Sequence, residues 1–343
     1  MGRKALYVLI CLVLVIGLVL GACAKPAPAP APAPKPAPKA EPIVLEGIMG
    51  NKVNQPADKP WYLFVDRVKE LSNGELIIDV IGGKEIMPGR DQPEAIAKGI
   101  FDISPTSAGW VEKLVTPIGM FYQRRIPPDE MRRRGAYDLL KEECAKVGLY
   151  YVGPSGDVVS DMYYIMTNIP VKTPYELKGQ TLATFATLQQ WLDVLGITPA
   201  MMAPGDRYTA VEQGVADGMA GQLRYAFSSG NYEVLDYWID HGIYSSTNNI
   251  MMNLDRYNSL PEHLQKVIDQ AYLELEKPGA EMASEFLGTA KKQLIAEGGM
   301  TPITFSPEDA KYYVDIASTT RWEFLYEKYP EWAPKIFELW GKP

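Results

Sequence analysis

A run of short helix and strand patterns between Pro170 and Gly218 restricts the fold of this 343-residue chain more than any other feature. Thr173, Pro174 and Glu176 have the spacing of a capping box, and Gly179 supplies a left-handed stop after it. Strand patterns then alternate with helical ones, the strands around Leu182 and over 197–203 and 215–219, the helices over 188–195 and 206–213. This alternation predicts a parallel sheet covered on both faces, in which ligands bind beyond the carboxyl ends of the strands.

Two motifs lie near the ends of that stretch. The first is Pro170-Val171-x-Thr173-Pro174-x-x-Leu177-Lys178-Gly179, and the second is Tyr208-x-Ala210-x-x-x-Gly214-x-x-Asp217-Gly218. Together and in this order they resemble the solute receptors of tripartite ATP-independent periplasmic (TRAP) transporters, the dicarboxylate-receptor family. A Gly99-x-x-Asp102 pattern nearer the amino end agrees, so the resemblance extends over nearly the whole chain after residue 40. It implies an α/β, two-lobed periplasmic-binding-protein fold of the type II-like class.

The amino end has the pattern of a bacterial lipoprotein signal. Arg3 and Lys4 precede an apolar run over residues 5–20 that is short for a membrane span, and small residues stand directly before Cys23. We expect residues 1–22 to be a signal peptide and Cys23 to carry lipid, so that the protein is extracytoplasmic and membrane-anchored. An ordinary signal with an incidental cysteine and a retained anchor helix are the alternatives.

Residues 23–42 form a tether in this interpretation, because their alternating alanine and proline favour extended polyproline II. At about 3.1 Å per residue, residues 24–40 reach roughly 50 Å. Residues 1–40 carry five basic groups and no acidic one, so the net charge of −8 becomes −13 for the rest of the chain. This acidity argues against nucleic-acid binding. Cys144 is the only cysteine after the tether, and no disulfide framework is expected.

The length and the resemblance predict two lobes. We assign residues 43–162 with 250–288 to the first lobe and residues 163–249 with 289–343 to the second. A long helix after Ser259 is expected to span the lobes, and Pro278-Gly279 inside it should kink it. A monomer is the default expectation.

The sequence shows no catalytic constellation. His241 and His263 stand apart from cysteines and paired carboxylates, and the chain has neither a phosphate-binding glycine loop nor a nucleophile elbow. We therefore expect no enzyme activity, no catalytic residue, no cofactor and no metal ligands.

The expected binding residues depart from the pattern of the family. Its receptors usually carry an arginine on the strand after the first motif, another seven residues before that motif, and an asparagine just after the second motif. These three positions hold Ala183, Tyr163 and Gly221. By looser alignment, a polar first-lobe position falls near Ser107 or Trp110 and an aromatic one at Pro204.

Small and aromatic side chains thus replace charges and amides. Trp110, Tyr163, Phe185 and Tyr225 are expected near the cleft, where aromatic walls supply stacking and burial. This favours a bulky or aromatic-bodied organic acid over a small dicarboxylate. If the ligand keeps a carboxylate, its predicted anchor is Arg224 or Arg90, and Gln222 completes the predicted site. The alternative is that the aromatic residues are lobe core and the arginines are solvated.

The sequence therefore predicts an extracytoplasmic receptor that binds an organic acid between two lobes and delivers it to the membrane permease subunits of a TRAP transporter. Ligand must favour the closed arrangement of the lobes, since closure otherwise carries no signal. A binding protein for an ATP-driven (ABC) importer or for a sensor kinase would use the same lobes. An extracytoplasmic enzyme is the remaining alternative.

Overall fold

The computed structural model describes residues 41–50, 53, 58–155, 162–245 and 248–342, and Pro42–Pro343 form one compact unit. The expected signal peptide, the lipid-bearing Cys23 and the tether up to residue 40 lie outside the described residues. No helix in the described ranges is long and apolar enough to cross a membrane.

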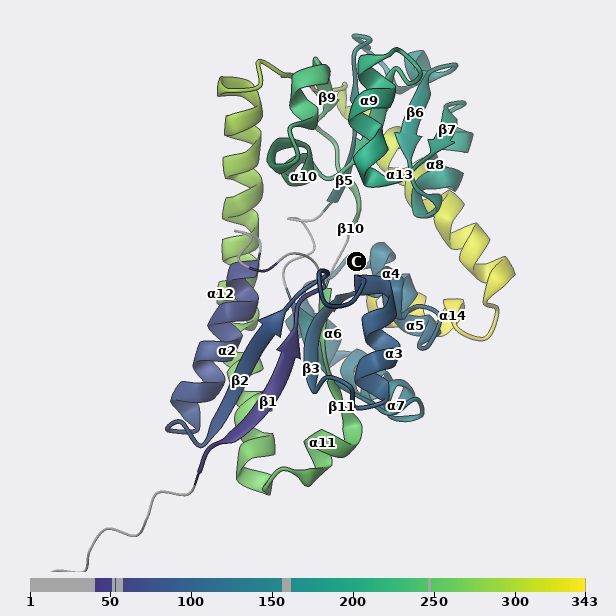
Figure 1. The fold of residues 1–343 in the computed structure, drawn as a ribbon. Coiled ribbons are helices and arrows are strands. Elements are labelled where there is room, and N and C mark those ends of the chain that lie inside the picture. The colour runs from purple at the N-terminus through teal and green to yellow at the C-terminus, as the bar shows by residue number, and fades with distance from the viewer. Residues whose placement is uncertain (1–40, 51–52, 54–57, 156–161, 246–247, 343) are drawn as a thin grey trace, which may run out of the picture. The chain divides into compact units, whose positions relative to one another are not determined.

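Two β-sheets organise this unit (Figure 1). The first has five strands in the order β2-β1-β3-β11-β4: β1 (Ile43–Ile48), β2 (Leu76–Gly82), β3 (Ile103–Ser107), β4 (Leu149–Ser155) and β11 (Asn248–Asn253). β1 runs parallel to β2 and β3, whereas β11 is antiparallel to β3 and β4. We call this sheet and the helices packed on it the first lobe.

The second sheet has seven strands in the order β12-β9-β5-β8-β6-β7, with β10 paired to β5. Its strands are β5 (Met162–Thr167), β6 (Thr181–Thr184), β7 (Thr198–Met201), β8 (Gly218–Gly221), β9 (Tyr237–Ile239), β10 (Ile243–Ser245) and β12 (Thr301–Ile303). β6 is parallel to β7 and β8, as the sequence predicts, but β5 is antiparallel to β8 and β9. The sheet, which defines the second lobe, is therefore mixed.

Most helices are short. The first lobe contains α2 (Lys59–Leu71), α3 (Gln92–Ala97), α4 (Ala108–Val111), α5 (Thr116–Gly119), η3 (Met120–Gln123), α6 (Pro128–Arg133), α7 (Ala136–Ala145), α11 (Leu254–Ser259) and α14 (Ala333–Ile336). The second lobe contains η4 (Pro174–Leu177), α8 (Gln189–Val194), η6 (Pro204–Asp206), α9 (Arg207–Glu212) and α10 (Leu223–Ser228). The second-lobe helices cover both faces of the second sheet. Successive residues of β5 therefore lie in different cores, Ile165 in one and Met166 in the other.

Helix α12 (Glu262–Ala296) joins the cores of both lobes (Figure 1). Leu264 and Ile268 pack in the first-lobe core, whereas Leu287 and Leu294 pack against the second sheet. The helix is continuous but bent, with Pro278 inside it. The predicted fold class, a two-lobed α/β protein with a long kinked helix, is confirmed.

Helix α13 (Pro307–Lys328) is a second connection. Tyr313 and Ala317 lie in a second-lobe core, whereas Trp322 and Leu325 belong to the first-lobe core together with Trp340. The end of the chain thus packs with the first-lobe core, and the division of the chain into 43–162 with 250–288 and 163–249 with 289–343 stays a prediction.

The second sequence motif has a structural explanation. The Asp217 carboxylate accepts a hydrogen bond from the backbone N–H of Thr181 at 2.7 Å, which ties the start of β8 to β6. A Cβ atom on Gly218 would lie 2.1 Å from the carbonyl oxygen of Met166. Only glycine therefore allows β5 and β8 to approach each other this closely.

We predict that Gly218→Ala lowers the free energy of unfolding by roughly 1–3 kcal/mol, because the added methyl group forces two paired strands apart. Urea unfolding measures this change. The matched control is Gly205→Ala, since nothing lies within 4 Å of a Cβ atom there, and its effect should stay within about 0.5 kcal/mol. Equal effects of the two variants would contradict this explanation.

Candidate functional site

Arg207, the first residue of α9, is a buried cation. Its side chain is 6% exposed, and its Nε has no hydrogen-bond partner in the part of the chain that the structure describes. Burial lowers the pKa of Arg207 below its ordinary value, with Tyr225 and Tyr163 acting in the opposite direction. No described carboxylate forms an ion pair with it. Such a charge is costly to bury unless an anion compensates it.

Aromatic side chains lie beside this guanidinium. Arg207 stands over the ring of Phe185 at 5.3 Å from the ring centroid, a cation–π contact. Tyr163 of β5 packs edge-on against Phe185, with ring centroids 5.3 Å apart. Tyr225 of α10 is close enough to act electrostatically on Arg207 and is 39% exposed. We call Tyr163, Phe185, Arg207 and Tyr225 the Arg207 cluster.

Tyr122 of η3 connects the Arg207 cluster to the first lobe. Ser107, at the end of β3, and Tyr163 are polar neighbours of its hydroxyl group. Burial raises the pKa of Tyr122, and these two neighbours oppose that rise. The rings of Tyr122 and Tyr163 lie 6.2 Å apart between centroids. Residues of both lobes thus meet in one chain of aromatic contacts that ends at Arg207.

The arrangement suits a carboxylate with an apolar body. A guanidinium group presents a planar fork of donors that matches the two oxygens of a carboxylate, and such charge-assisted bonds are strongest where water is excluded. Phe185 places a flat apolar ring directly beside this fork, and the buried Tyr163 packs edge-on against that ring. The cluster can therefore hold the charged end and the body of one organic acid at the same time.

Four of the predicted site residues, Ser107, Tyr163, Phe185 and Tyr225, are brought together by this chain of contacts. Trp110 lies instead against backbone, since a Cβ atom on Gly50 or Gly89 would meet its ring at 2.7 and 2.4 Å. Contact between each of these residues and the ligand stays a prediction.

The other predicted residues lie outside these contacts. Ala183 is fully buried in a second-lobe core, and Gly221 pairs with Tyr164 in the sheet. Gln222 precedes α10, where Arg224 is half-buried, whereas Pro204 and Arg90 are exposed. Their roles in binding also stay predictions.

Arg207 and Tyr122 were not among the residues that we selected from the sequence. A signal for Arg207 was present, because it follows the predicted strand 197–203 and opens the predicted helix 206–213. Ligands are expected beyond the carboxyl end of such a strand. No pattern in the sequence indicates that this cation is buried, however, and Tyr122 carries no motif.

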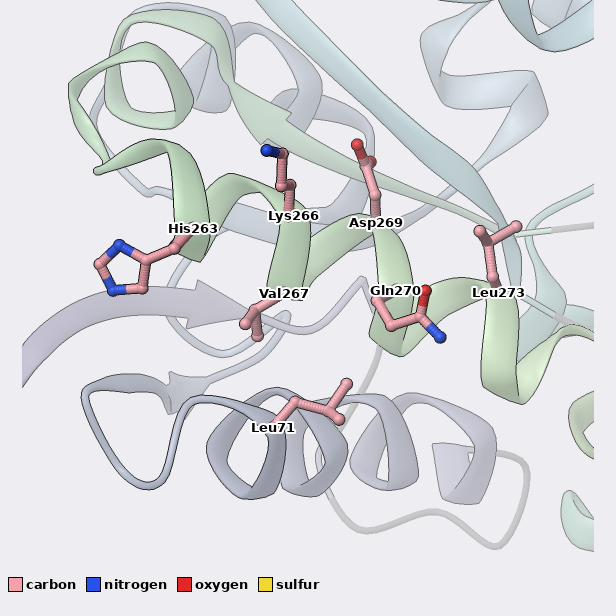
Figure 2. Close-up of a pocket in the computed structure, with 7 residues that line it drawn as sticks. All are labelled: Leu71, His263, Lys266, Val267, Asp269, Gln270 and Leu273. Atoms are coloured by element: carbon pink, nitrogen blue, oxygen red, sulfur yellow. The ribbon is translucent and has the colours of Figure 1, made fainter.

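A pocket of about 470 Å³ lies far along the first lobe from these residues, between the end of α2 and the first turns of α12 (Figure 2). Its polar side chains already have partners: Lys266 pairs with Glu262, Asp269 accepts a hydrogen bond from Tyr150, and Gln270 donates one to Glu274. We therefore do not consider it the ligand site. No group of acidic, histidine or cysteine side chains in the described residues could hold a metal ion.

The sequence matches the bacterial extracellular solute-binding proteins, family 7, over residues 49–328. The chain belongs to this family. Its relatives include the ectoine-binding periplasmic protein TeaA of Halomonas elongata, which is 22% identical over 58% of this chain and 60% of its own length. The ectoine/5-hydroxyectoine-binding periplasmic protein UehA of Ruegeria pomeroyi is 25% identical over 53% of this chain and 56% of its own length.

Solved structures share the fold of this family 7 protein. A TRAP periplasmic solute-binding protein from Ochrobactrum anthropi has a TM-score of 0.75 and 18% identity, with 86% of this chain and 94% of the other covered. An extracytoplasmic solute receptor from Bordetella pertussis, which binds pyroglutamic acid, has a TM-score of 0.71 and 17% identity, with 87% and 99% covered. At this identity the likeness concerns the fold.

We predict that Arg207→Met raises the free energy of unfolding of the ligand-free protein by about 1 kcal/mol or more. Because burial lowers the pKa of Arg207, the charged form is less favoured in the folded than in the unfolded chain. This cost is present at every pH below the folded-state pKa, and so at neutral pH. Thermal and urea unfolding at pH 7 measure it.

The control is Arg90→Met, because Arg90 is exposed and its replacement should change stability by less than about 0.5 kcal/mol. A loss of stability in the Arg207 variant would show that the protein itself compensates this charge.

Proposed function

We propose that this family 7 protein is the extracytoplasmic solute receptor of a TRAP transporter and that it binds an organic acid through Arg207. The observation that carries the proposal is the buried guanidinium without an acidic partner among the described residues. Related structures with bound succinate and bound L-gulonate support an acidic ligand. A carboxylate on Arg207 would supply the missing negative charge.

The body of the ligand is proposed to be bulky or aromatic. Phe185 and Tyr163 present their rings beside the anchor, and Tyr225 stands at the exposed side of the cluster. Where relatives of the family usually place an arginine, Ala183 is sealed in the core and Tyr163 takes part in ring packing. A second carboxylate would thus lack the partners that a small dicarboxylate needs.

The same proposal includes the wider role of the protein. The protein is proposed to deliver its solute to membrane permease subunits and to be attached through lipid on Cys23, in agreement with the sequence patterns described above. A monomeric state is the default expectation. A receptor role without catalysis agrees with the solute-binding family. Genes for two permease subunits beside this one would support a TRAP system over an ABC importer or a sensor kinase.

Native mass spectrometry of the purified protein tests the proposal first. Denaturation should release one organic acid with a bulky or aromatic body. A small dicarboxylate would keep the receptor role but contradict the proposed pocket. If the protein carries no ligand, a thermal-shift panel of organic acids replaces this step, since a saturating ligand raises stability by RT ln(1 + [L]/Kd).

We predict that Arg207→Ala weakens binding of the identified acid at least about 30-fold, equivalent to about 2 kcal/mol, because the carboxylate loses its buried partner. Isothermal titration calorimetry measures the affinity. Arg90→Ala is the matched control and should bind like the unaltered protein. If the Arg90 variant loses affinity and the Arg207 variant does not, the anchor assignment is wrong.

Phe185→Ala should weaken binding of an aromatic carboxylate about tenfold, because it removes the ring against which the body packs. The same variant should change the affinity for a small aliphatic carboxylate of equal charge by less than about threefold. Tyr175→Ala serves as the control, since Tyr175 is an exposed second-lobe aromatic residue that stacks on Tyr312. Equal losses for both ligands would count against an aromatic-bodied solute.

A further inference from the structure

A separate cavity of about 200 Å³ lies at the connection between the lobes. Its walls are η3 with the two residues that follow it, Met162 at the start of β5, residues 242–244 around β10, and one face of α13. The chain passes from β4 to β5 and from β10 to β11, and two of these walls are the second-sheet ends of these passages. An occupant would therefore lie beside the start of β5 and beside β10.

The cavity offers hydrogen-bond donors without partners. Gln123 lines it and is 2% exposed, and its side-chain Nε2 is buried with no partner in the described ranges. Arg125 also lines it, held in place by a 2.8 Å hydrogen bond from its backbone N–H to the carbonyl oxygen of Trp340. Its guanidinium forms no ion pair with a described residue. No carboxylate is among the described residues of the wall.

Arg321 adds a second positive charge near this cavity. It lies one helical turn beyond Ala317 and Ser318, which form part of the wall, and it is 5% exposed. Its Nη1 donates to Gln190 at 3.2 Å, whereas its Nε has no described partner. Arg321 acts on the pKa values of Tyr122 and Tyr244, both wall residues, and lowers each of them against the effect of burial.

Among the described residues, the carboxylate that acts on the wall is that of Glu112. Glu112 acts on Tyr122 in the opposite direction to Arg321 and raises its pKa. Its carboxylate already accepts a hydrogen bond of 3.1 Å from the hydroxyl group of Tyr329. Among the described wall residues, Gln123 thus offers a donor and Arg125 a cation, which is the chemistry that binds an oxyanion.

We propose that this cavity is a second binding site, for a small oxyanion such as a short carboxylate or phosphate, held by the Gln123 amide and the Arg125 guanidinium. The site does not depend on the function proposed above. Tyr122 belongs to its wall and its ring lies 6.2 Å, between centroids, from that of Tyr163 in the Arg207 cluster. If an acid binds at Arg207, occupation of this cavity should change its affinity, and the effect should be reciprocal.

Selenate is a suitable probe, because it is an oxyanion whose selenium is located by anomalous diffraction. Crystals soaked in selenate should show an anomalous peak within hydrogen-bond distance of Gln123 Nε2 and Arg125. In solution, selenate should raise the unfolding temperature with a saturable dependence, whereas chloride at equal ionic strength should not. Parallel titrations with formate and with inorganic phosphate distinguish a carboxylate site from a phosphate site.

Variants separate this site from general salt effects and from Arg207. Sulfate-like ions also stabilise proteins by exclusion from their surface, so the saturable part of the shift is the relevant readout. Arg125→Ala, at an exposed position, should weaken the saturable selenate affinity at least fivefold, and Arg207→Ala should leave it unchanged. Absence of the anomalous peak, or an Arg125 variant with unchanged affinity, would overturn the proposal. Loss of the effect only in the Arg207 variant would place the anion there instead.

Discussion

A guanidinium group buried without a counter-charge among the described residues is the constraint on which the proposed function depends. Arg207 loses hydration at the first turn of α9, and Phe185 and two tyrosines replace only part of it. A cation–π contact is worth about 2 kcal/mol when it is desolvated, less than a buried charge requires. The cores on both faces of the second sheet stabilise a lobe that can tolerate this cost. In the proposed function, this imbalance favours an anionic solute over a neutral one of the same shape.

The residues that carry the family resemblance and the residues proposed to bind ligand perform different tasks. Gly179 and Gly214 adopt left-handed backbone conformations, Asp217 joins two strands, and Gly218 permits their close approach. These requirements belong to the scaffold and are independent of the solute. Phe185 and Arg207 lie between the motifs, at the carboxyl ends of β6 and β7, where substitution does not disturb the strand pairing. A receptor can therefore change its ligand and keep its motifs.

This separation explains what could be predicted from the sequence. The parallel strands of the second lobe and the two helices between them follow from periodicity and glycine stops, because those patterns reflect local geometry. The passage of α13 from a second-lobe core to the first-lobe core could not be predicted in this way. An apolar helix face does not reveal which core it enters. Arg207 was missed for a related reason: burial of a charge results from Phe185 and Tyr163, which are distant in sequence.

The most direct test of the account is a crystal structure of the protein with its co-purified or identified organic acid. The account predicts a ligand carboxylate within hydrogen-bond distance of the Arg207 guanidinium, with the body of the ligand against Phe185 and Tyr163. A bound acid whose carboxylate contacts Arg224 or backbone N–H groups, while Arg207 pairs with a protein carboxylate, would contradict it.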